Sequence, residues 1–156
     1  MFLTVHATVG ALIGQHSPNI LVAFVLGIIS HYIVDAIPHG DENLIGEDKA
    51  NITKKEILLI LKIVSLDVII MSSLLYCLYS QGLINPSWTI ISGIIGSILP
   101  DFFNGIYLLT KNKFLKKSSM FHFNLHFITG KTISLKAGLV VQLIILSLII
   151  LIATIV

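Results

Sequence analysis

Residues 28–41 read IISHYIVDAIPHGD, and this stretch directs the interpretation of the whole chain. His31 and Asp35 stand near the end of an apolar run, four positions apart. On a helix this spacing places both side chains on one face, one turn apart. A charged group in an apolar helix is energetically costly, so it normally has a partner or a function. The stretch predicts an apolar helix that carries a polar pair, and metal binding is the function that the pair favours.

The composition of the whole chain indicates an integral membrane protein. Of its 156 residues, 55% are hydrophobic and only 12% are charged, whereas a soluble domain carries about 25% charged residues. The length allows about four or five membrane helices of about 20 residues each. We therefore predict an all-α integral membrane protein, in which residues 1–156 form a single membrane domain of about four to five transmembrane or re-entrant helices.

The apolar runs place the expected helices along the chain. The expected transmembrane or re-entrant segments are 2–14, 19–36, 54–79, 88–110 and 135–156, with an interfacial segment at 119–130. Segment 19–36 is long enough to span with little tilt, and 135–156 is the clearest span, whereas 2–14 is short for one. Residues 15–19, QHSPN, are expected to form a turn. Residues 121–127 alternate apolar and polar side chains, which suits a strand or a helix with its histidines on one face.

The lysines predict the orientation of these segments in the membrane. The net charge of the chain bears on its partners. If every segment crosses the membrane, the lysine-bearing regions 40–51 and 111–136 fall on one side, which the positive-inside rule makes cytoplasmic. The net charge of +2 is too small to indicate a nucleic-acid partner. The expected partner is the lipid bilayer.

A hairpin about the 15–19 turn is expected to bring His6 beside His31 and Asp35. His6 lies roughly 11 residues before Ser17 and His31 roughly 14 after it, so at about 1.5 Å per residue their heights differ by only about 4–5 Å. The predicted topology also puts the remaining candidates at the cytoplasmic level, with Asp101 inside segment 88–110 and the histidine pair before the last segment.

Imidazole and carboxylate groups therefore gather at one level of the membrane. The candidate metal ligands are His6, His31, Asp35, Asp101, His122 and His126. These are the ligand types of catalytic zinc sites and of some manganese or iron sites, so we expect a divalent metal, with zinc favoured. A bound metal lowers the pKa of its water and supplies hydroxide for hydrolysis. Asp35 and Asp101 are the candidate catalytic residues, because either could act as general base where it is not a ligand.

The same residues also allow a structural interpretation. His31 and Asp35 could form a buried ion pair that fixes helix packing, and His6 could be hydrogen-bonded to a carbonyl group. Asp101 follows Pro100, so its carboxylate could cap backbone groups that the proline frees. The 119–130 segment could be a membrane-surface anchor with solvated histidines. On this interpretation the chain is a non-enzymatic membrane protein, either a structural subunit or a small ion or metal carrier.

Three short motifs carry a resemblance to a known family. They are His6-x-x-x-Gly10, Gly27-x-x-Ser30-His31-x-x-x-Asp35-x-x-Pro38 and Leu99-Pro100-Asp101. They resemble motifs of small bacterial and archaeal inner-membrane proteins described as membrane-bound metal-dependent hydrolases. The resemblance implies a helical fold in the prokaryotic cytoplasmic (inner) membrane and a metal-dependent hydrolase activity. The family's recurring polar positions are matched by His6, His31, Asp35 and Asp101.

The chain also departs from that family in its paired histidines. The family usually has four residues between them, including an arginine, whereas three residues without arginine separate His122 from His126. The function that we expect is a multi-pass, membrane-embedded metal-dependent hydrolase with its site near the cytoplasmic face. A phosphoester or a lipid head group would suit that location as substrate.

Overall fold

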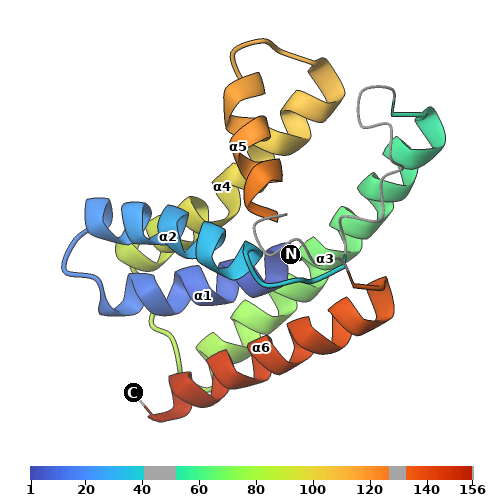
Figure 1. Ribbon diagram of the computed structural model, residues 1–156. Coiled ribbons are helices and arrows are strands. Elements are labelled where there is room, and N and C mark those ends of the chain that lie inside the picture. Colours follow the sequence, from blue (N-terminus) through green and yellow to red (C-terminus); the bar gives the residue numbers. More distant parts are fainter. Residues whose placement is uncertain (41–51, 127–132, 156) are drawn as a thin grey trace.

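The computed structural model describes residues 1–40, 52–126 and 133–155, and the regular structure within these ranges is entirely helical (Figure 1). The helices are α1 (Leu3–His16), α2 (Ile20–Asp35), α3 (Lys54–Ser80), α4 (Trp88–Thr110), α5 (Lys116–His126) and α6 (Leu135–Ile155). The predicted all-α class is confirmed for the described residues.

Three of these helices, α3, α4 and α6, are long and apolar enough to cross a membrane. The other two apolar helices are shorter, with 14 residues in α1 and 16 in α2. At about 1.5 Å per residue, α2 is roughly 24 Å long, less than the roughly 30 Å of a hydrocarbon core. Segment 19–36 was expected to be long enough to span with little tilt, and its helix falls short of that length.

One local expectation is wrong. Gln15 and His16 belong to α1 rather than to the turn, because Pro18 disfavours helical geometry only at the residue before it. The side chain of Asn19 then accepts a hydrogen bond from the N–H of Val22 and caps α2. Residues 121–126 are helical, which is one of the two forms that their alternation suits, and their helix begins at Lys116, before the expected start of the interfacial segment. Part of that segment, 127–130, lies outside the described residues.

Helix α4 makes the most extensive helix contacts in the described structure, with α1, α2 and α5 packed against it. Glycines allow this close approach: a Cβ atom on Gly93 would collide with the carbonyl oxygen of Gly10, and one on Gly10 would collide with Ser97 and the backbone of Gly93. The Gly10–Gly14 spacing, typical of close helix contacts, therefore faces α4. This contact brings α1 and α2 to the same side of α4.

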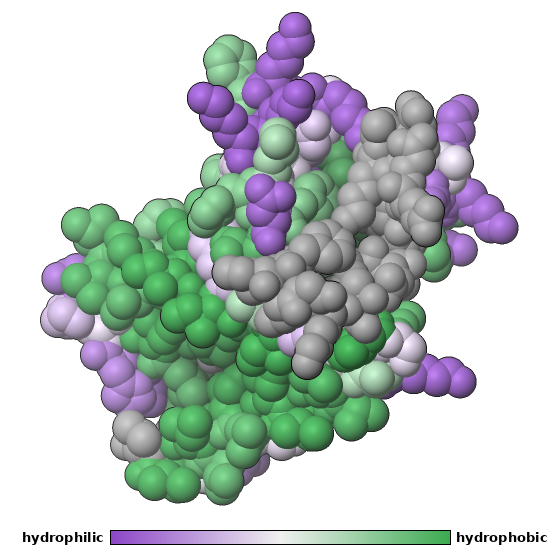
Figure 2. Space-filling view, viewed as in Figure 1, coloured by the Kyte–Doolittle hydropathy of each residue, from purple (hydrophilic) through white to green (hydrophobic). Residues whose placement is uncertain are grey.

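The outer surface of the helices is strongly apolar. Leu21 on α2, Leu66 on α3 and Leu143 on α6 are each more than half exposed, at 71%, 60% and 62%. In the face shown by Figure 2, hydrophobic side chains cover α2 and α6, while hydrophilic ones gather around α5 and the start of α3. A continuous apolar surface of this kind needs lipid or protein against it, which is consistent with a membrane protein.

Two polar side chains in otherwise apolar helices hold the start of α1. Asp67 of α3 accepts hydrogen bonds from the N–H of Leu3 at 2.6 Å and from that of Thr4 at 3.4 Å. Gln142 of α6 accepts one from the N–H of Phe2 at 2.8 Å and donates one to the carbonyl oxygen of His39 at 3.2 Å. A carboxylate at a helix N-terminus is favourable for the helix dipole. These contacts fix the first turns of α1, where His6 lies.

Candidate metal centre

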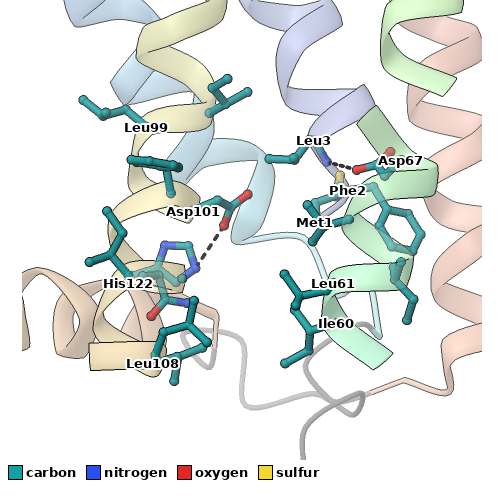
Figure 3. A pocket seen from close by; sticks show the side chains of 18 of the residues that line it. Met1, Phe2, Leu3, Ile60, Leu61, Asp67, Leu99, Asp101, Leu108 and His122 are labelled. Carbon is teal, nitrogen blue, oxygen red and sulfur yellow. Dashed lines mark hydrogen bonds and ion pairs between the residues drawn. The ribbon is translucent and has the colours of Figure 1, made fainter. Parts of the chain in front are cut away.

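Four side chains from three helices meet at the C-terminal end of α2. His31 and Asp35 come from α2, Asp101 from α4 and His122 from α5. One ligand atom from each lies within 4.8 Å of the others, and the group could hold a metal ion. His31, Asp35 and His122 are buried, whereas the side chain of Asp101 is 23% exposed. The part of Asp101 that stays accessible faces a cavity beside the group (Figure 3).

The distances within this group suit a metal site. His31 Nε2 lies 3.1 Å from Asp35 Oδ2 and 3.9 Å from Asp101 Oδ1. His122 Nε2 lies 3.5 Å from Asp101 Oδ1 and 3.9 Å from Asp35 Oδ2. Ligand atoms that are about 2.0–2.1 Å from a zinc ion at the corners of a tetrahedron stand roughly 3.3 Å apart. These four separations lie around this value and all four ligand atoms lie within 4.8 Å of one another, so the group could hold a metal ion.

The orientation of His31 is set by the helix opposite. Its Nδ1 atom lies 2.7 Å from the carbonyl oxygen of Ser97 on α4. That carbonyl can only accept a hydrogen bond, so Nδ1 carries a proton. Nε2 then faces the carboxylates of Asp35 and Asp101 and requires either a second proton or a metal ion between them. A ring nitrogen that donates to a backbone carbonyl while the other faces carboxylates is the arrangement usual for metal-binding histidines.

His6 lies directly beside this group, as the predicted α1–α2 hairpin requires. Its ring stacks on that of His31 with 4.2 Å between the ring centroids. Its Nε2 atom is 3.0 Å from Asp35 Oδ1 and 3.8 Å from Asp101 Oδ2, whereas its buried Nδ1 atom has no hydrogen-bond partner within the described structure. His6 therefore contacts the second oxygen of Asp35 and can serve either as a further ligand or as the residue that orients Asp35.

Asp35 needs a positively charged partner, because of its position in the helix and its burial. It is the last residue of α2, at the negative end of the helix dipole, where a carboxylate is unfavourable. It is also 1% exposed, so burial adds to the need for a positive partner. In this structure the amino group of Met1 lies 2.7 Å from Asp35 Oδ1. The position calls for positive charge, which a bound cation would also supply.

His39 is a member of the site that sequence reasoning did not include among the ligands. It is 1% exposed, its Nε2 atom is 2.8 Å from the Met1 amino group and 3.9 Å from Asp35 Oδ1, and its Nδ1 atom is 2.7 Å from the carbonyl oxygen of Ile37. The signal available in the sequence was its position, four residues after Asp35. The residues that flank it, Pro38 and Gly40, are typical of a loop instead.

The group found among the described residues does not include His126, His16 or Asp67. His126 ends α5, but its side chain lies outside what the structure describes. His16 is at the opposite end of α1 from His6, exposed, with its Nδ1 atom 2.9 Å from the carbonyl oxygen of Leu12. Asp67 of α3 contacts the start of α1 through its hydrogen bonds from Leu3 and Thr4. The structure thus brings His6, His31, Asp35, Asp101 and His122 together.

Comparisons with protein-family models, with curated proteins and with solved structures find no match for this chain. The function must therefore be argued from the residues of the site.

Proposed function

We propose that this protein is a metal-dependent hydrolase embedded in a prokaryotic inner membrane, with its active site near the cytoplasmic face. The observation that carries the proposal is the orientation of His31. Its Nδ1 atom is committed to the carbonyl oxygen of Ser97 at 2.7 Å, and its Nε2 atom points at Asp35 and Asp101. The imidazole and carboxylate groups gathered here could hold a metal ion, and they lie beside a cavity.

The ligand set would consist of His31, Asp35, Asp101 and His122. Two imidazoles and two carboxylates favour zinc, and the same donors also suit manganese or iron. A metal held there would act as a Lewis acid that activates water for attack on an ester. His6 would hold Asp35 in place through its contact with Oδ1. The short motifs that resemble those of membrane-bound metal-dependent hydrolases support this assignment.

The two carboxylates differ in exposure, and this difference suggests their roles. Asp35 is buried, so it is suited to binding the metal, whereas Asp101 is partly exposed and lines the cavity. Where Asp101 is not itself a ligand, so that this position on the metal is open to water, it would receive the proton of the attacking water. The water oxygen forms a bond to the phosphorus of a phosphoester as the bond from phosphorus to the leaving oxygen breaks, and that oxygen then takes up a proton. General-base catalysis of this kind contributes about 10²–10⁴-fold.

Two features support the membrane location: the apolar helices of spanning length and the distribution of the lysines along the chain. Three helices have the length and composition of spans, and the lysines lie in or near the regions that the positive-inside rule places in the cytoplasm. Lys54 and Lys55 begin α3 and Lys111 follows α4, and residues near these helix ends line the cavity beside the site. A site at this level would meet a phosphoester or a lipid head group at the cytoplasmic leaflet.

The experiment that tests the proposal is hydrolysis of bis(4-nitrophenyl) phosphate by detergent-purified protein loaded with zinc, manganese or iron(II). We expect release of 4-nitrophenolate that requires the metal and is lost in His31→Ala and in Asp101→Asn. His16→Ala is the matched control, because this histidine lies outside the site. Each variant is first checked for helical content and a monodisperse elution profile.

Two results would overturn the proposal. Hydrolysis that is equal in all four proteins would show that it arises outside this site. A stoichiometric metal without hydrolysis of phosphomonoesters, phosphodiesters or carboxylic esters would favour the non-enzymatic alternative, in which the group binds a metal for structure or transport.

A further inference from the structure

A cavity of about 610 Å³ lies beside the candidate metal centre, between α3, α4 and the start of α1 (Figure 3). Its walls are mainly aliphatic, with Ile60, Leu61 and Val64 on the α3 side and Ile98 and Leu108 on the α4 side. This volume is within the range of about 300–1,000 Å³ for sites that bind small molecules. Helix α3 packs against α1, whereas α3 and α4 make no extensive contact with each other.

Of the four polar side chains among the described residues that line this cavity, two are engaged in other contacts and two belong to the site. Asp67 is engaged with the start of α1, and Asn104 Oδ1 accepts a hydrogen bond from Ser119 at 2.6 Å. Asp101 and His122, 3.5 Å apart, present the remaining polar side chains to the cavity. A ligand that fills this space therefore meets ionisable groups at one place and hydrocarbon elsewhere.

Lysines surround the cytoplasmic ends of the same helices. Lys54 and Lys55 begin α3, Lys111 follows the last residue of α4, and Lys116 and Lys117 begin α5. Clusters of lysine at a membrane surface attract anionic lipids. The charge favours a ligand with a negative head group, and the walls favour one with a hydrocarbon chain.

We propose that this cavity binds the aliphatic chain of a phospholipid whose phosphate ester lies at Asp101 and His122. The inference rests on the proposed function and names the substrate class of that site. A small water-soluble phosphoester would leave the aliphatic walls unused. A lipid enters laterally between α3 and α4, since both helices expose apolar side chains to the surroundings.

Gly105 offers a way to fill the cavity without disturbing the helices. It lines the cavity on α4, and a Cβ atom added there meets nothing within 4 Å. Gly105→Phe therefore places a ring in the space proposed for the chain. Ile91→Phe is the matched control, because Ile91 is 45% exposed on the outer surface of the same helix.

The first measurement compares two phosphodiesters, 4-nitrophenyl decyl phosphate and 4-nitrophenyl ethyl phosphate, with metal-loaded protein. In both, water bonds to phosphorus, the aryl P–O bond breaks and 4-nitrophenolate leaves. We expect kcat/KM for the decyl ester to exceed that for the ethyl ester by about tenfold or more, because the apolar walls discriminate by chain. Gly105→Phe should abolish this ratio, and Ile91→Phe should keep it. Equal values for the two esters in the wild type, or a ratio that survives in Gly105→Phe, would overturn the proposal.

The second measurement needs no catalysis and separates this inference from the proposed function. Phosphatidic acid with a diazirine in its acyl chain is photolysed with the protein in nanodiscs, and the labelled residues are mapped by mass spectrometry. We expect labelling concentrated on residues 57–64 and 98–109, reduced in Gly105→Phe and unchanged in Ile91→Phe. If neither ester is hydrolysed but this labelling pattern is observed, the binding site for the aliphatic chain of the lipid is supported and the proposed hydrolase function is rejected. Labelling spread equally over the outer face of α6 would overturn the chain site.

Discussion

The Nδ1 atom of His31 lies 2.7 Å from the carbonyl oxygen of Ser97, which stands one helical turn before Asp101 on α4. This hydrogen bond links the two helices that supply three of the four candidate ligands. It fixes the tautomer of His31 and aims Nε2 at both carboxylates. The same helix therefore supplies one ligand and orients another, so the geometry of the site depends on the packing of α2 against α4.

The first prediction concerns metal content. Detergent-purified wild-type protein should hold about one zinc, manganese or iron ion per chain, because its four ligand atoms suit one small cation. His31→Ala and Asp35→Asn should each lose it. The measurement is elemental analysis of the purified protein after dialysis.

Folding must be measured alongside, because removing one member of a buried charged pair can cost about 3–5 kcal/mol. His16→Ala is the control, since it removes an exposed histidine and should retain the metal. A wild type that binds no metal even after reloading would leave His31 and Asp35 as a packing pair.

The second prediction concerns pH. Metal-binding histidines must be neutral, so protons compete with the metal. The bound metal should therefore be retained at neutral pH and released progressively as the pH falls. Dialysis over a pH series, followed by elemental analysis and return to neutral pH with added metal, measures this. Retention that does not change down to about pH 4 would contradict a site built on histidine.

The third prediction compares two glycines of α4. Gly93→Ala should disrupt the bundle, because its Cβ would collide with the carbonyl oxygen of Gly10, and such overpacking costs about 1–3 kcal/mol or more. Gly105→Ala should be tolerated, because its Cβ meets nothing within 4 Å and alanine favours helix. Thermal unfolding in detergent measures both. Equal unfolding temperatures would show that α1 and α4 are not held in this close contact.

The helices and the His6–His31 contact could be predicted from the sequence because both follow from local rules. Apolar runs bounded by turn residues located the long helices within a few residues, and a fixed rise per residue brought His6 level with His31 across a short turn. These predictions need no knowledge of how distant segments pack.

The parts that the sequence did not predict depend on distant contacts. The role of Gln142 becomes visible only when α6 lies against the start of α1 and the residues after α2, since its partners are Phe2 and His39. The cavity depends on how far α3 stands from α4, which no local pattern determines. The helical form of residues 121–126 was undecided because a strict alternation of apolar and polar residues also suits a strand.

The last prediction concerns Asp67, which should position α1 and thereby His6. Asp67→Ala removes the acceptor of the Leu3 and Thr4 N–H groups, and the loss of such buried partners costs about 1–3 kcal/mol. We expect a lower unfolding temperature and a weaker metal affinity in a competition titration, whereas Asp67→Asn, which keeps one acceptor oxygen, should lose less of both. Glu56→Ala is the control, because Glu56 caps the start of α3 through Thr53 and should affect stability alone. If Asp67→Ala destabilises the protein but binds the metal as tightly as Glu56→Ala does, Asp67 contributes only to folding and does not position the site.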